Sequence, residues 1–215
     1  ERYRYPMLKK VAKLLANLHK ESLAFSAQVV SDDQYSAFSF RMINFDEESL
    51  ENKVYTDLCK EYLLSYKLTK LNLESFYEHE QKMMIHNDLK SDNLLFNKNN
   101  ISGIIDFGDS RVSVKEEDLG CFIWDMCDKL SRKNREFKGF VKAFIKEYKR
   151  WSPGFSLNNA KAAIDYALDR YLIINLHYLR VNQSDERMIK YQVNKATNQL
   201  KIIKELTALR DSLKL

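Results

Sequence analysis

Apolar positions recur at helical spacing in the first part of the chain. After Pro6, which suits the first turn of a helix, they fall three and four residues apart on one face: Leu8, Val11, Leu14, Leu15 and Leu18. This spacing predicts a helix. Residues 22–45 have no clean period and are interpreted as a loop with an irregular segment, after which Asp46 is a candidate N-cap.

The pattern between residues 50 and 107 changes from helical to strand-like. A second helix is marked by apolar residues four apart: Leu50, Val54, Leu58 and Tyr62. A third helix is expected from Leu71 to about Gln81. From Met83 the short apolar runs "MMIH", "NLLF" and "ISGIIDF" alternate with polar residues, and the cluster "NKNN" separates the last two. We therefore predict two short strands joined by this Asn-rich turn.

The helical period returns at Glu116. Apolar residues from Leu119 to Met126 predict one helix, and three more are expected over residues 137–148, 160–179 and 187–213, with "WSPG" between the first two of these three. Only five Gly and two Pro are present, which argues against a turn-rich all-β fold. The predicted fold class is α+β, mostly helical, with one small central β-hairpin.

Composition narrows the classes of function. A chain of 215 residues, 45% apolar and 30% charged, is typical of a soluble domain with a sizeable core. The net charge of +5 is scattered at helical spacing, so no nucleic-acid partner is expected, and no apolar run approaches the ~20 residues of a membrane span. Cys59, Cys121 and Cys127 lie in apolar helical patterns and predict neither disulfides nor zinc, which favours a cytoplasmic location.

The residues with candidate chemistry lie in "HNDLKSDN" and "IIDFGD". The first matches His-x-Asp-x-x-x-x-Asn, and the second places Asp-Phe-Gly after a strand. In phosphoryl transfer a carboxylate orients the attacking hydroxyl, while amide and carboxylate oxygens hold Mg²⁺ against the phosphates. That template makes Asp88 the catalytic base and Asn93 and Asp106 the metal ligands. Two such motifs in this order, one hairpin apart, form a specific signal.

These motifs resemble those of the aminoglycoside phosphotransferase and choline kinase family, within the protein-kinase-like fold. "HND" and "GIIDFGDS" are most similar to the aminoglycoside 2″-phosphotransferases, and the helix ending "LLANLH" resembles the one that follows the interlobe hinge. The resemblance implies that His86 is a structural member of the catalytic loop. It also implies that Leu95 and Ile105 form the apolar floor under the nucleotide base, although residues of an ordinary hydrophobic core would show the same sequence pattern. Asp118 matches an Asp that braces the loop, and a helix N-cap would look identical.

The resemblance further implies a division into lobes. The whole chain, 1–215, corresponds to a kinase-like C-terminal lobe, with the catalytic loop and metal-binding hairpin at 84–110 and a helical substrate-binding region at 116–215. No Gly-rich phosphate loop precedes the motifs, and the first glycine is Gly103. We expect the N-terminal nucleotide lobe, which is absent from this sequence, to be a necessary partner from the same polypeptide. The donor would be ATP or GTP, and this fragment alone should turn over poorly.

Family members phosphorylate hydroxyls of small, often cationic molecules, so carboxylates near the base are candidate substrate ligands. The candidates are Asp109, the helical pairs Asp125 with Asp128 and Asp165 with Asp169, and the aromatic face of Trp124. Taken singly, each of these acids more often lies on the solvated surface, and a Trp in so apolar a helix more often lies in the core. An aminoglycoside-like acceptor is predicted first.

Other functions stay open at this stage. A choline-, ethanolamine- or homoserine-kinase-like enzyme fits "HND" equally well. A kinase-like module without turnover is disfavoured because all three chemistry residues are present. A eukaryotic-type protein kinase is disfavoured because only nine residues separate Gly108 from Asp118, which leaves no room for the usual activation segment.

Overall fold

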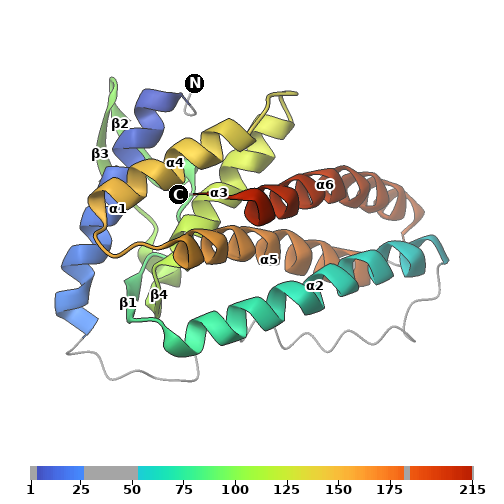
Figure 1. The fold of residues 1–215 in the computed structure, drawn as a ribbon. Coiled ribbons are helices and arrows are strands. Elements are labelled where there is room, and N and C mark those ends of the chain that lie inside the picture. Colours follow the sequence, from blue (N-terminus) through green and yellow to red (C-terminus); the bar gives the residue numbers. More distant parts are fainter. Residues whose placement is uncertain (1–3, 27–52, 182–184, 215) are drawn as a thin grey trace.

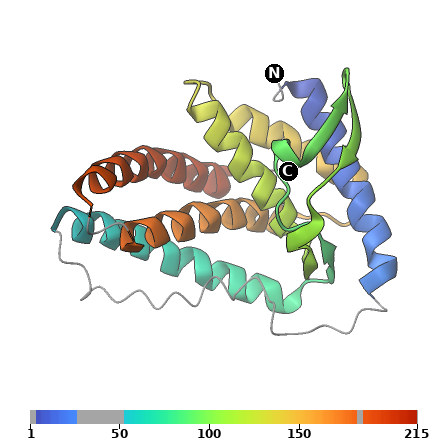
Figure 2. The ribbon, with the colours of Figure 1, turned by 180° about the vertical axis from the view of Figure 1, so that it is seen from behind.

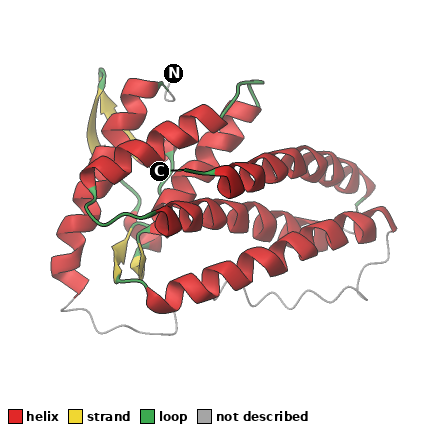
Figure 3. Cartoon of the chain, in the orientation of Figure 1, coloured by secondary structure: helices red, strands yellow, loops and turns green. Residues whose placement is uncertain are grey.

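The computed structural model describes residues 4–26, 53–181 and 185–214 as a mostly helical domain with two small sheets (Figures 1 and 3). The helices are α1 (Tyr5–Ser26), α2 (Lys53–His79), α3 (Glu116–Ser131), α4 (Lys138–Trp151), α5 (Leu157–Val181) and α6 (Glu186–Ser212). The strands are β1 (Lys82–Ile85), β2 (Leu94–Asn97), β3 (Asn100–Ile104) and β4 (Arg111–Val114), with 3-10 turns η4 (Ser91–Asn93) and η5 (Phe107–Asp109). The predicted fold class is confirmed.

The helix predictions are confirmed for α1 and α3 to α6, with α1 continuing through residues 22–26 of the segment interpreted as irregular. The prediction of two helices between residues 50 and 81 is wrong, because α2 is one uninterrupted helix. Its middle contains no Pro or Gly, and the Ser65 hydroxyl bonds back to the Glu61 carbonyl one turn earlier instead of ending the helix. The remainder of the irregular segment, with Asp46 and Leu50, lies outside the described residues.

The strands of the described part form two separate antiparallel pairs. β2 and β3 pair around the Asn97–Asn100 turn, as predicted. β1 pairs with β4, with Met83 opposite Ser113, and this second sheet was missed because "RVSV" is only four residues long and its partner is distant in sequence. The prediction of a single hairpin was therefore incomplete. The β1–β4 pair closes the ends of the segment that carries both motifs, so residues 86–110 emerge from one anchored base.

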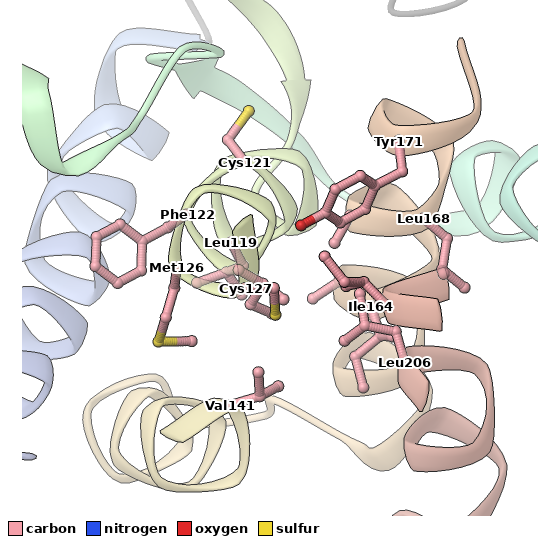
Figure 4. Packing of buried hydrophobic residues seen from close by; sticks show 14 of the residues in the cluster. Leu119, Cys121, Phe122, Met126, Cys127, Val141, Ile164, Leu168, Tyr171 and Leu206 are labelled. Carbon is pink, nitrogen blue, oxygen red and sulfur yellow. The ribbon is translucent and has the colours of Figure 1, made fainter. Parts of the chain in front are cut away.

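The helical core is built around α3 and α5. Figure 4 shows buried side chains where four helices meet: Leu119, Phe122 and Met126 of α3, Val141 of α4, Ile164, Leu168 and Tyr171 of α5, and Leu206 of α6. In Figure 1, α5 lies between α2 and α6, and it also packs along α3. Because α3 begins directly after β4, this core fixes the base of the motif-bearing segment.

The β2–β3 hairpin is tied to α1 at its tip. The Lys10 ammonium donates to the Asn99 carbonyl at 2.6 Å and to the Asn100 amide oxygen at 2.8 Å. Figure 2 shows the hairpin standing beside α1 on the face that carries the motif segment. α1 in turn packs against α4 and β1, so the tip of the hairpin is anchored to the helical domain.

Gly120 sets the distance between α3 and α5. A Cβ there would lie 2.4 Å from the Tyr166 Cβ and 3.0 Å from the Ala163 carbonyl oxygen. We expect Gly120→Ala to destabilise the fold by about 1–3 kcal/mol, because it overpacks a rigid contact. At this chain length each kcal/mol lowers the Tm by about 2–4 °C. Thermal unfolding of both variants tests this against Gly103→Ala, whose new Cβ would make an ordinary 3.6 Å contact with Leu95; equal melting of the two variants would contradict it.

The described helices and the three cysteines can be compared with what the composition predicts. Among the described helices, none combines the length and apolar character required to cross a bilayer. Cys59, Cys121 and Cys127 are all buried, and none of the three forms a disulfide.

Candidate active site

The loop that carries the first motif is anchored to α3. Asp118 accepts hydrogen bonds from the backbone N–H groups of His86, at 2.9 Å, and Asn87, at 2.6 Å. Asn87 adopts the left-handed conformation with φ 65°, which Asn tolerates better than most residues. The two bonds fix the backbone immediately before Asp88.

Asp118 is itself held by a buried polar network. It is fully buried, its Oδ2 lies 3.1 Å from His19 Nε2, and His19 Nδ1 lies 2.8 Å from the Tyr148 hydroxyl. Burial alone would raise the pKa of Asp118, but the bonds from His19, His86 and Asn87 lower it below its ordinary value. Of its two sequence interpretations, the N-cap position is taken by Lys115, and the Asp118 side chain bonds the loop instead.

Ile105 joins the two motifs through its backbone. Its N–H donates to the Asn93 carbonyl at 3.0 Å, and its carbonyl lies 2.9 Å from His86 Nε2. Because His86 Nδ1 accepts from the N–H of Asp88, at 3.3 Å, the pattern assigns the proton to Nε2. His86 is 1% exposed, so it acts as a fixed spacer between the loops. Asp106 follows directly and is therefore set beside this junction.

Three donors converge on the Asp88 carboxylate, which is 17% exposed. Lys90 Nζ lies 2.5 Å from Oδ2, and Asn93 Nδ2 donates to the same oxygen at 3.2 Å. Arg170 Nη2 approaches Oδ1 at 3.5 Å. The hydrogen bond to Asp88 raises the pKa of Lys90 above its ordinary value, with a smaller contribution from the Asp106 charge. The carboxylate is thus oriented and surrounded by cationic groups.

Asn93 and Asp106 supply oxygen atoms suited to a hard cation. Asn93 Nδ2 also donates to the Asp88 carbonyl at 2.9 Å, which leaves the amide oxygen as the atom to ligate a metal. Asp106 is exposed and left-handed, with φ 69°. Mg²⁺ takes one or two such protein ligands and completes its shell with waters and phosphate oxygens. The chemistry of this donor set therefore fits Mg²⁺.

Apolar side chains are exposed beside the junction. Leu95, Ile105 and Phe107 are 46%, 43% and 49% exposed. Leu95 pairs across the hairpin with Gly103, which has no side chain to cover it. The alternative that Leu95 and Ile105 are plain core residues is wrong, and their role under a nucleotide base stays a prediction.

The two acids on α3 that were predicted as substrate ligands have intramolecular partners. Asp125 is 5% exposed, accepts the N–H of Ser91 at 2.8 Å, and lies 3.0 Å from Lys129 Nζ. Asp128 lies 2.7 Å from an Arg132 nitrogen. Asp125 therefore holds the far end of the catalytic loop rather than facing solvent.

The acids on α5 are buried as well. Asp165 is 4% exposed and lies 2.5 Å from Arg210 of α6, and its burial raises its pKa. Asp169 is 6% exposed. The structure thus does not join the two helical pairs into an open anionic pocket. Asp109, in η5 directly after the metal motif, is the exposed member of the predicted set.

Trp124 is half-buried, and one face of its ring is turned toward the guanidinium group of Arg170. The guanidinium carbon of Arg170 lies 5.6 Å from its ring centroid, and Tyr171 meets the ring edge-on at 6.1 Å. The indole N–H is buried without a hydrogen-bond partner. An internal arginine thus uses the aromatic face that was predicted for a substrate cation.

Three further residues complete the site: His19, at the end of the "LLANLH" segment, Lys129 and Arg170. Lys129 donates to the Ser91 hydroxyl at 2.7 Å and contacts Asp92 at 2.8 Å. Its i,i+4 spacing from Asp125 could have revealed it. His19 ends the quoted "LLANLH" segment of α1, although its contact with Asp118 could not be inferred from it, and no local pattern links Arg170 of α5 to the loop.

Comparison with known proteins identifies a matching family and several solved structures with the same fold. A model described as the phosphotransferase enzyme family matches residues 2–154. Three solved structures share the fold at low identity: a choline kinase from Cryptosporidium parvum Iowa II (TM-score 0.60, 17% identity), an amicoumacin kinase (0.57, 11%) and a spectinomycin phosphotransferase (0.59, 15%). They cover 98%, 92% and 97% of this chain, which spans 70%, 60% and 67% of theirs. No curated protein sequence matches significantly.

Proposed function

This chain belongs to the phosphotransferase enzyme family, and from that premise we propose that it transfers the γ-phosphate of a nucleotide to a hydroxyl of a small molecule. The observation that carries the proposal is the junction at Ile105. The backbone of this one residue bonds on both sides, through its N–H to Asn93 and through its carbonyl to His86, and Asp106 follows it directly in the chain. A base and two metal-ligand candidates from separate motifs thereby meet at one place.

In the proposed reaction the acceptor oxygen bonds to the γ-phosphorus, and the bond from that phosphorus to the β,γ-bridging oxygen breaks. The hydroxyl proton passes to Asp88, whose orientation by Lys90 and Asn93 sets the direction of attack. Transition states of this kind are loose, so positioning contributes more than covalent chemistry. When bound by Asn93 and Asp106, Mg²⁺ would neutralise charge on the phosphate oxygens.

The donor in this proposal is ATP or GTP. The exposed side chains of Leu95 and Ile105 supply an apolar surface on which a planar base can lie. The amicoumacin kinase structure contains AMP-PNP and Ca²⁺, and the spectinomycin phosphotransferase structure contains ADP. Both are consistent with a nucleotide donor for this chain.

Two acceptor classes are proposed. An aminoglycoside-like acceptor rests on the motif similarity between residues 84 and 110. A smaller amino alcohol, of the choline, ethanolamine or homoserine kind, is favoured by the internal pairing of Asp125, Asp128 and Asp165. A polycation needs several available carboxylates, whereas a single cationic group needs few, and Asp109 is exposed to supply one.

The test is a phosphotransfer assay on the full-length protein that carries this chain. ATP and GTP are supplied in parallel with Mg²⁺, against aminoglycosides, choline, ethanolamine and homoserine. We expect turnover with one acceptor class and loss of turnover when EDTA removes the metal. Nucleotide binding without turnover would exclude the acceptors tested, and absence of nucleotide binding would contradict the proposal.

A further inference from the structure

We propose that Arg170 of α5 is a positioning residue that holds the Asn87 peptide and the Asp88 carboxylate in place for transfer. The inference rests on the proposed function, because it assigns Asp88 as the base. It concerns a helix that lies outside the family match, which ends at residue 154. The role therefore comes from the contacts of this chain.

Arg170 reaches two consecutive residues of the catalytic loop. Its Nη1 donates to the Asn87 carbonyl at 3.1 Å, and its Nη2 lies 3.5 Å from Asp88 Oδ1. The planar guanidinium presents donors in a fixed fork, so one rigid group holds a peptide oxygen and a carboxylate together. A lysine in its place could not span both acceptors with the same geometry.

The backbone of Asn87 is thereby held from two helices. Asp118 of α3 accepts its N–H at 2.6 Å, and Arg170 of α5 donates to its carbonyl. Asn87 is in the left-handed region, which Asn adopts more readily than most residues but which the surrounding contacts must still select. Contacts on both sides of this residue lock the turn that leads into Asp88.

Arg170 is fixed by its own neighbours. The Cys121 thiol donates to the same Asn87 carbonyl at 3.0 Å and touches the guanidinium, while the Trp124 ring lies beneath it. Burial raises the pKa of Cys121 to about 12, so it remains a thiol donor at neutral pH. Cys121 and Trp124 both belong to α3, which packs closely on α5 at Gly120. The α3–α5 interface thus determines the orientation of the Arg170 guanidinium group.

If Arg170 formed only an ordinary exposed ion pair with Asp88, substitution of Arg170 would have a different effect. Such pairs contribute about 0–1 kcal/mol to stability, and a pair of that kind gives no reason to expect a change in kcat when it is removed. The Arg170 side chain is 29% exposed and bonds to the backbone next to the proposed base. If it positions that base, its removal should lower kcat without altering how tightly substrates bind.

The experiment compares Arg170→Ala and Arg170→Lys in the full-length protein, with Arg150→Ala as the matched control. Arg150 is 70% exposed and pairs with Glu147 on α4. We expect Arg170→Ala to lower kcat by about 10²-fold, as a misplaced group does, with little change in either KM. The Lys variant should retain part of the rate, and added guanidinium should partly restore the Ala variant. The control should match wild type.

A second measurement separates this inference from the proposed function. Amide hydrogen exchange over residues 84–96 should accelerate in Arg170→Ala and not in Arg150→Ala. If the wild-type protein binds no nucleotide, the proposed function fails, and faster exchange still supports the positioning role. Normal kcat and unchanged exchange would overturn it. A loss of rate that guanidinium cannot restore, together with a matching fall in Tm, would also overturn it.

Discussion

Asp88→Asn is expected to lower kcat for phosphoryl transfer by roughly 10²–10⁴-fold, while the nucleotide still binds. The amide keeps the size of the carboxylate but cannot accept the hydroxyl proton. It also removes the charge that Lys90 and Arg170 face, at 2.5 and 3.5 Å. Nucleotide affinity should change little, because the proposed metal ligands are Asn93 and Asp106 and not Asp88.

Asp92→Asn is the matched control for this variant. Asp92 lies in the same loop, its side chain is 58% exposed, and it pairs with Lys129 of α3. It should transfer phosphate at a near-normal rate. Initial rates and nucleotide titrations on both variants are the measurement, and a near-normal kcat in Asp88→Asn would remove Asp88 from the base role.

What the sequence could predict was local. The helices at α1 and α3 to α6 follow from apolar spacing with Pro, Gly or polar breaks between them, and the β2–β3 hairpin follows from "NKNN". The loop that carries Asp88 and Asn93 could be placed because its motif is continuous in sequence. Asp106 could be added because a single hairpin separates it from that motif, so few conformations are available between them.

What could not be predicted depends on packing between distant elements. β4 was missed because its partner β1 lies on the other side of the whole motif segment. Arg170 reaches the loop only because α5 packs on α3, and His19 reaches Asp118 from α1. The acids assigned to substrate show the same difficulty. The sequence pattern leaves Asp165 free to bind substrate, whereas in the fold α6 places Arg210 within 2.5 Å of it.

Asp118→Asn is expected to destabilise the fold by about 3–5 kcal/mol, which is the usual cost of breaking a buried charged network. Asn has one acceptor oxygen and an NH₂ group, whereas Asp118 accepts from His86 N–H, Asn87 N–H and the His19 ring. At least one buried donor would lose its partner. We also expect kcat to fall at temperatures where the variant is folded, because the bonds that fix the backbone before Asp88 are weakened.

The matched control is Asp185→Asn. Asp185 also accepts two backbone N–H groups, from Arg187 and Met188, but it does so as the exposed N-cap of α6, where Asn serves almost as well. Thermal and denaturant unfolding should therefore separate the two variants by several kcal/mol. Equal stability would mean that the Asp118 network contributes no more than an ordinary cap.

The pH dependence of unfolding tests the electrostatic origin of the Asp118 effect. The folded-state pKa of Asp118 is lowered, so its stabilisation is fully present above the ordinary carboxyl value of about 4. It is lost as the pH falls through the lower folded value, because the unfolded chain takes up the proton first. The stability gap between wild type and Asp118→Asn should therefore be constant near neutral pH and narrow below about pH 4. A gap that persists unchanged into acid would assign the loss to altered packing, and the brace on the catalytic loop would then be one of shape rather than charge.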